Sequence, residues 1–282
     1  MSASFARRKR KNRLMFGLTA VCALVAFSAL FFILGYIVYQ GCSALSLDFL
    51  LNLPKPVGEQ GGGIANAIVG SLKIVALAGA VAAPVGVLAA VYLVEYGSQR
   101  AAFIVRYSAD LLNGMPSIVI GIFIYTLLVL PMKGFSALAG SAALAMIMIP
   151  IVLRNTEEII RLVPASLREA GLALGLPRWK VIVRIVLPTA AGGIVTGILL
   201  AISRIAGETA PLIFTAFGNR FWDSGMFSPM AALPLTIYTY AISPYPDWHR
   251  QAWAAALILM LVVLVGNIMA RLLLRRCYGA AR

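Results

Sequence analysis

Long apolar segments alternate with short polar segments along the chain. The apolar segments cover residues 14–40, 64–94, 110–130, 136–153, 188–217 and 251–274. A helix needs about 20 apolar residues to cross the hydrocarbon core of a bilayer. Lipid offers no hydrogen bonds to the backbone, so each segment has to form a helix whose backbone groups pair with one another. The pattern therefore predicts an all-α polytopic membrane protein with six transmembrane helices.

Composition and charge agree with this class and orient the chain. Of the 282 residues, 61% are hydrophobic and 12% are charged, and 24 Lys and Arg against 10 Asp and Glu give a net charge of +14. Most basic residues lie in the tail 1–13, the loop after residue 94, the segment 154–187 and the C-terminal tail, which the positive-inside rule assigns to the cytoplasm. Both termini are thus predicted to be cytoplasmic, and no nucleic-acid partner is needed to explain the charge.

The chain has few residues suited to catalysis. His249 is the only histidine, and Cys22, Cys42 and Cys277 lie far apart in the sequence. The chain therefore has almost none of the residues that a metal site or a Ser/His/Asp triad would need. The sequence also contains no G-x-x-x-x-G-K-[ST] motif, which would cradle nucleotide phosphates. We therefore predict a protein that is not an enzyme and has no catalytic residue, metal or cofactor of its own.

The longest polar interruption between apolar segments is the predicted cytoplasmic loop 154–187. Residues 164–173 read as a short helix that Ser166 could cap, with Glu169 three residues later as in a capping box. Gly175 breaks this helix, and a second helix is expected from about residue 178. In the second helix an apolar stripe is expected at helical spacing, formed by Trp179, Val183 and Val186.

The loop also carries a spaced motif. Glu169, Ala170 and Gly171 are followed after three residues by Gly175 and after nine more by the sequence IVLP. This spacing resembles the cytoplasmic loop of ABC importer permeases, with Gly171 where that pattern most often has alanine. The resemblance implies a type I ABC importer permease architecture, with residues 64–274 as the permease domain and the basic tail and first helix before it.

In that family the loop docks onto a separate ATPase subunit, with the glutamate nearest the partner. The resemblance therefore implies that Glu169, Ala170, Gly171 and Gly175 couple the chain to an ATPase dimer, and that ATP and Mg are bound there. A plainer interpretation stays open, in which the loop only lies on the membrane surface through its arginines.

Two charges stand within the fifth apolar segment. Arg204 falls about halfway between residues 188 and 217, where an unpaired charge costs about 2.5–3.5 kcal/mol or more. Glu208 follows four residues later and would lie on the same face of a continuous helix. The two could form a self-contained ion pair, or Arg204 could bind phosphate or carboxylate oxygens with its planar fork while Glu208 orients it. We take the second interpretation and predict a substrate pathway at these residues.

A closer resemblance covers most of the chain from about residue 64. The stretches LNGMPSIVIGIF (112–123) and SRIAGETAPLIFTA (203–216) are similar to the PstA-type permease family of bacterial phosphate ABC importers. This implies a multi-pass protein of the bacterial inner membrane that imports inorganic phosphate. It also implies a heterodimer with a second homologous permease, an ATPase dimer and an extracytoplasmic phosphate-binding protein. An importer for sulfate or molybdate, or an ATP-independent secondary transporter, stays open as an alternative.

Overall fold

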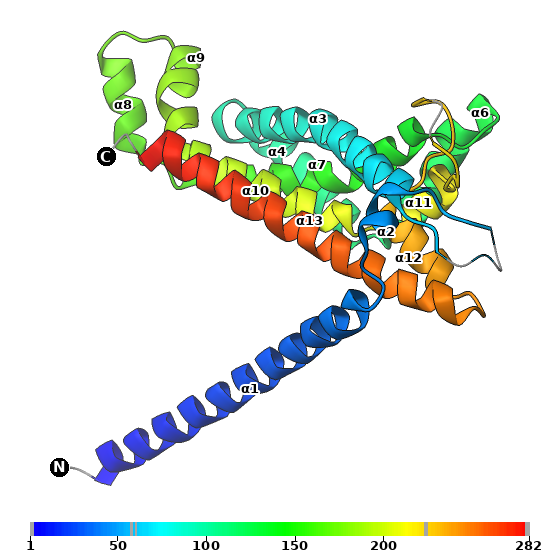
Figure 1. Ribbon diagram of the computed structural model, residues 1–282. Coiled ribbons are helices and arrows are strands. Elements are labelled where there is room, and N and C mark those ends of the chain that lie inside the picture. The colour runs from blue at the N-terminus through cyan, green and yellow to red at the C-terminus, as the bar shows by residue number, and fades with distance from the viewer. Residues whose placement is uncertain (1–2, 57–58, 60, 223–224, 280–282) are drawn as a thin grey trace.

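The computed structural model describes residues 3–56, 59, 61–222 and 225–279, and helices dominate this part of the chain (Figure 1). Among these residues the β-structure is limited to an isolated bridge between Phe217 and Met230. In the described part of the chain, five helical stretches are long and apolar enough to cross a membrane: α1 (Ala3–Cys42), α3 (Ala65–Glu95), α7 (Ala137–Arg161), the run Arg178–Ala206 and α13 (Pro246–Gly279). The predicted all-α class is confirmed.

The sixth candidate span is broken. The helix α4 (Gln99–Gly114) meets α5 (Ser117–Ile124) at a bend of 103°, and α5 continues through the π-helical turn η1 (Tyr125–Val129) into α6 (Leu130–Met132). The expected single helix over 110–130 is therefore wrong. Pro116 is the cause, because it lacks an N–H and forces the residue before it out of helical backbone; Met115 has ψ 138°.

The core of the bundle is the contact between α3 and α7. Small residues on α3, such as Ala78 and Ala82, are fully buried against larger ones on α7, such as Leu144 and Met148. At Gly86 a Cβ atom would lie 2.8 Å from Cβ of Val152 on α7. Small residues let membrane helices approach closely, which replaces the hydrophobic force that lipid does not supply. These two helices thus form a rigid centre for the bundle.

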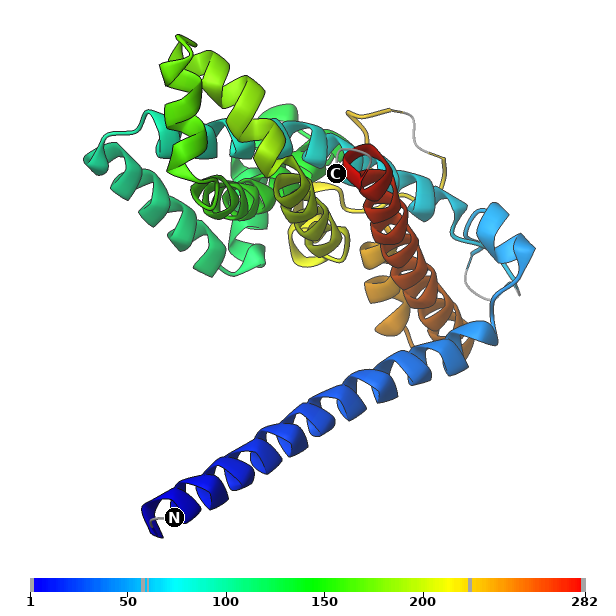
Figure 2. The same ribbon diagram turned by 90° about the vertical axis from the view of Figure 1, so that its left-hand side faces the viewer.

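The first helix diverges from the bundle (Figures 1 and 2). The C-terminal end of α1 contacts α13. There Gly41 packs on Leu257, and Tyr36 lies edge-on to Trp253 with the ring centroids 5.2 Å apart. None of its most apolar 18-residue window is buried within the chain. The helix α1 begins at Ala3, so residues of the predicted basic tail 1–13 lie on the same helix as the predicted first span.

The remaining short helices gather at the two ends of the bundle. At one end lie α8 (Ala165–Ala173) and α9 (Arg178–Val181), which continues through the π-helical turn η2 (Ile182–Val186) into α10 (Leu187–Ala206). At the other end lie α2 (Leu47–Leu51), α11 (Ala210–Thr215) and α12 (Leu233–Ala241) (Figure 1). The fifth helix, expected to reach residue 217, ends instead at Ala206.

Candidate functional site

A two-helix unit projects from one end of the bundle and is formed by α8 and α9 (Figures 1 and 2). Gly175 ends α8 with φ +78°, a backbone conformation that glycine adopts without steric cost. Its N–H donates to the carbonyl of Leu172, and the next N–H, of Leu176, donates to the carbonyl of Gly171. These two hydrogen bonds form the Schellman motif, which ends a helix at a glycine. The predicted break at Gly175 is therefore observed.

Gly171 lies where the two helices of this unit touch. It is buried, and a Cβ atom there would lie 2.7 Å from Cδ1 of Ile185 and 3.0 Å from Cγ2 of Val181. The glycine in place of the usual alanine thus lets α8 sit closer to the following helix. An alanine there would require the flexible end of the Ile185 side chain and Cγ2 of Val181 to shift.

Two details of the loop differ from expectation. Pro164 precedes α8 without a side-chain cap, and Ser166 lies inside the helix, so the expected capping box is wrong. In the second helix Trp179 and Val183 are more than half exposed, whereas Val181, Ile182 and Val186 are buried. The π-helical turn η2 adds residues to one turn and thereby rotates the buried face away from a regular 3.6-residue stripe.

The outer face of the two-helix unit is exposed and carries both charged and apolar side chains. Glu169 and Ala170 are exposed on α8, beside Leu172 at 51% and Leu174 at 82% exposure. On the second helix Trp179 is 57% exposed. Apolar side chains clustered at an exposed projection are typical of a protein contact surface. The geometry therefore offers a carboxylate, a small residue and apolar side chains to a partner.

Arg168 joins this projection to the bundle. Its Nε lies 3.0 Å from Oε1 of Glu95, the last residue of α3. Its two terminal nitrogens donate to the carbonyl oxygens of Ile160 at 2.9 Å and Val163 at 2.7 Å, at the end of α7. Glu95 is 7% exposed, and a carboxylate at a helix C-terminus opposes the helix dipole, so the arginine is what stabilises it there.

A second charged cluster surrounds Glu157 of α7, which is 2% exposed. Its carboxylate lies 2.6 Å from Nε of Arg106 on α4, 2.7 Å from Arg161 and 3.4 Å from Arg154. Arg154 in turn lies 3.0 Å from Asp110 of α4. The cluster therefore ties the bent helix α4 to α7.

Sequence reasoning missed both charged links. Within one helix the spacing of Glu157 to Arg154 and Arg161, three and four residues away, could have indicated ion pairs. The links from Arg106 to Glu157 and from Arg168 to Glu95 join residues 51 and 73 positions apart. No local pattern identifies such partners.

Arg204 and Glu208 lie at the break between α10 and α11. Arg204 is in the last turn of α10 rather than at its middle, and Glu208 is in the turn after Gly207. No ion pair joins the two among the described residues, so the expected pairing along one helical face is wrong; the helix ends before Glu208. The side chain of Arg204 is exposed and that of Glu208 is half-buried, so both are accessible to a ligand or a partner chain.

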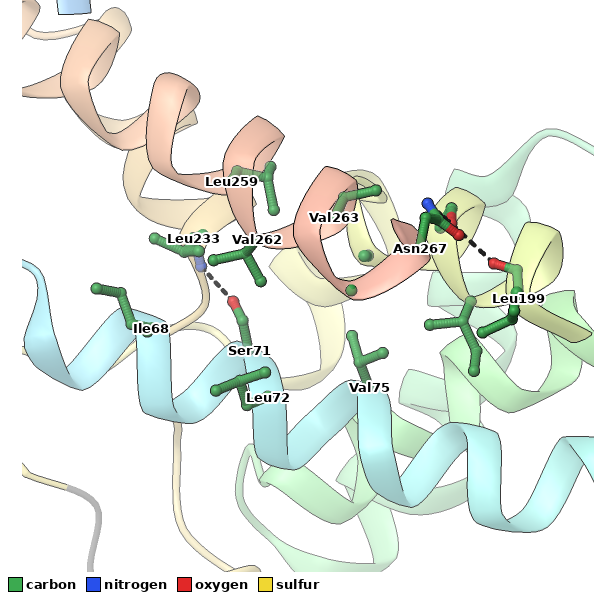
Figure 3. A pocket seen from close by; sticks show the side chains of 14 residues that line it. Ile68, Ser71, Leu72, Val75, Leu199, Leu233, Leu259, Val262, Val263 and Asn267 are labelled. Carbon is green, nitrogen blue, oxygen red and sulfur yellow. Dashed lines mark hydrogen bonds between the residues drawn. The ribbon is translucent and has the colours of Figure 1, made fainter. Parts of the chain in front are cut away.

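Ser203, beside Arg204, borders an apolar cavity of about 210 Å³ between α3, α10 and α13 (Figure 3). Asn267 of α13 donates to Oγ of Ser203 at 2.7 Å, and Oγ of Ser71 accepts from the backbone N–H of Leu233 at 2.6 Å. Both hydrogen bonds fix the walls of the cavity. The rest of its lining is almost entirely hydrocarbon, so it offers no binding group to an anion.

Comparison with known proteins places the chain in a class. Residues 82–277 match the family model described as the binding-protein-dependent transport system inner membrane component. The phosphate transport system permease protein PstA of Yersinia pestis is 45% identical over 94% of this chain and 90% of its own length. The protein of the same name from Haemophilus influenzae is 46% identical over 94% of each chain.

Solved structures agree on the fold. A chain of the bacterial alginate ABC transporter, solved with its alginate-bound periplasmic protein, aligns with a TM-score of 0.64 at 16% identity over 97% of both chains. A chain of the MetNI methionine ABC transporter in an inward-facing conformation aligns with a TM-score of 0.60 at 18% identity, covering 76% of this chain and 96% of its own. The fold is therefore that of type I ABC importer permeases.

Proposed function

Because the chain belongs to the family of binding-protein-dependent transport system inner membrane components, we propose that it is the permease subunit of an ATP-driven importer of inorganic phosphate. The PstA relatives, similar over nearly the whole chain, support phosphate as the cargo. The observation that carries the mechanism is the exposed two-helix unit that Arg168 ties to α3 and α7. The chain itself acts as a transport subunit and leaves ATP hydrolysis to a partner.

The unit formed by α8 and α9 is proposed to dock on the ATPase with Glu169 and Ala170 at the contact. Force on α8 has two routes into the bundle. One passes through Arg168 to the ends of α3 and α7. The other passes through α9, which is continuous with α10 over Arg178–Ala206. A push from the ATPase would therefore move three spans together and change which side of the pathway is open.

Arg204 and Glu208 are proposed to line that pathway. Supporting this role, the break at Gly207 leaves Arg204 exposed without an ion pair to Glu208. A guanidinium without a carboxylate partner can donate two parallel hydrogen bonds to phosphate oxygens. In the complete complex a second homologous permease would supply the opposite wall, and an extracytoplasmic binding protein would deliver the ion.

Co-purification from bacterial inner membrane tests this assignment. We expect the tagged chain to bring down an ATPase, a second permease and a phosphate-binding protein. The variant Glu169→Arg should lose most of the ATPase and keep the second permease, because it reverses the charge at the contact alone. Arg184→Glu, an exposed change on η2 away from that contact, serves as the matched control. Purification of the chain alone, with transport driven by an ion gradient, would contradict the proposal.

A further inference from the structure

Two ion pairs hold the bent helix α4 against the end of α7. Nε of Arg106 on α4 lies 2.6 Å from Oε1 of Glu157 on α7. Arg154 of α7 donates two hydrogen bonds to Asp110 of α4, from Nε at 3.0 Å and from a terminal nitrogen at 3.2 Å. Such a two-bond pair fixes the direction of a carboxylate as well as its distance. Because Arg106 and Asp110 are one helical turn apart, the two pairs together set the orientation of α4 on α7.

The apolar contacts that hold α4 involve small side chains. Its buried residues are Ala102 and Ala109, which belong to one cluster with Leu153 of α7. On the opposite face of α4, Phe103 is 67% and Ile104 is 62% exposed. An alanine buries little apolar surface, so the ion pairs contribute a large share of the attachment. Elements that move during function are drawn from such lightly packed parts of a fold.

The helix α4 also connects to the segment that carries Glu208. The chain continues across the bend at Pro116 into α5, and α5 packs closely on α11. At Gly121 of α5 a Cβ atom would lie 2.7 Å from Cα of Pro211 on α11, so the two backbones are in direct contact. The helix α11 begins two residues after Glu208. A displacement of α4 can therefore reach the turn at Glu208 through packed elements.

We propose that Arg106 and Asp110 are positioning residues for transport, which make α4 follow the end of α7 and so pass its movement through α5 and α11 to the turn at Glu208. This inference rests on the proposed function, in which the ATPase moves α7 through Arg168. Glu157 lies three residues before Ile160, whose carbonyl oxygen accepts a hydrogen bond from Arg168. The docking unit and α4 thus act on the same end of α7.

The double variant Arg106→Gln with Asp110→Asn tests the link. It removes both ion pairs between α4 and α7, while Glu157 keeps Arg154 and Arg161 as partners. In proteoliposomes that contain the whole complex, we expect the phosphate transported per ATP hydrolysed to fall at least fivefold. The ATPase should stay bound and active, because the docking unit is unchanged.

A cysteine next to α11 reports the movement itself. Thr209→Cys introduces the probe into the complex after the three native cysteines are replaced by serine; Thr209 is half-buried and directly precedes α11. With the ion pairs intact, a non-hydrolysable ATP analogue should change its rate of modification by a charged thiol reagent at least threefold. In the double variant the rate should be the same with and without the analogue. Ion pairs that only stabilise the fold would lower the melting temperature and leave this response in place, which would overturn the proposal.

Arg161→Gln is the matched control. It also removes an arginine from Glu157, at 2.7 Å, but both residues lie on α7. It should leave the transport ratio and the cysteine response unchanged, and an equal loss in this variant would overturn the role of the link to α4. A normal ratio in the double variant would do the same. Lack of ATP-driven phosphate uptake by the unaltered complex would instead contradict the proposed function, and the cysteine response would still test the link.

Discussion

Replacing Arg168 by alanine should lower ATP-driven phosphate uptake at least tenfold while the ATPase still binds. The change leaves Glu95 buried without its partner and frees α8 from the carbonyl oxygens at the end of α7. Loss of one partner from a buried ion pair typically costs about 3–5 kcal/mol. The measurement is the ratio of phosphate transported to ATP hydrolysed in proteoliposomes that contain the whole complex. Arg184→Ala, an exposed arginine in the same loop, should leave this ratio unchanged.

A double variant separates folding from coupling. Changing both Glu95 and Arg168 to leucine removes the two charges together, and such replacements are often neutral for stability. The melting temperature should therefore return toward that of the unaltered complex. Uptake should stay low, because leucine cannot bind the carbonyl oxygens of Ile160 and Val163. If Arg168→Ala transports phosphate at the normal ratio, the link through α3 and α7 has no part in coupling.

The variant Arg204→Gln should reduce phosphate uptake by about tenfold to a hundredfold. A charge-assisted hydrogen bond contributes about 1.5–3 kcal/mol, and about 1.4 kcal/mol corresponds to a tenfold change. Arg204→Lys keeps the charge without the planar fork, so it should retain an intermediate rate. Uptake rates and ATPase rates are measured together, since a damaged pathway lowers the first more than the second.

Arg271→Gln is the control for this change, because Arg271 is an exposed arginine near the end of α13. It should transport phosphate at the unaltered rate. Normal transport by Arg204→Gln would remove this arginine from the pathway and leave it as a structural or partner-facing charge.

The sequence was sufficient for the features that depend on local pattern. Apolar runs long enough to span a bilayer correspond to the long helices, and the spacing around Glu169 and Gly175 predicted the helix, the break and the second helix. These features follow from burial and backbone conformation within a few residues of each other. The exposure of Glu169 and the close packing at Gly171 are consistent with the resemblance stated from the motif.

Helix ends inside the apolar segments were harder to predict. Proline and glycine are tolerated in membrane helices, so the sequence predicts a span that runs through Pro116, although the chain bends by 103° there. It likewise predicts a helix that runs through Gly207, although α10 ends just before this residue. Tertiary packing decides whether such a residue kinks, breaks or merely interrupts a helix. The pairing of Arg204 with Glu208 failed for this reason.

Contacts between segments that are distant in the sequence could not be predicted from local patterns. The ion pairs from Arg168 to Glu95 and from Arg106 to Glu157 both join residues that lie far apart along the chain. Each contains a buried carboxylate whose partner is visible only when the helices are packed. The structure therefore adds these two ion pairs to the motif.

We infer that this chain imports phosphate only as part of an ATP-driven complex. The most direct test is the initial rate of radiolabelled phosphate uptake into proteoliposomes that contain the chain, its partner permease, the ATPase and the binding protein. We expect uptake that requires ATP and every component, and an excess of sulfate should not reduce it. Uptake by the chain alone under an ion gradient, or ATP-driven uptake of sulfate in preference to phosphate, would contradict it.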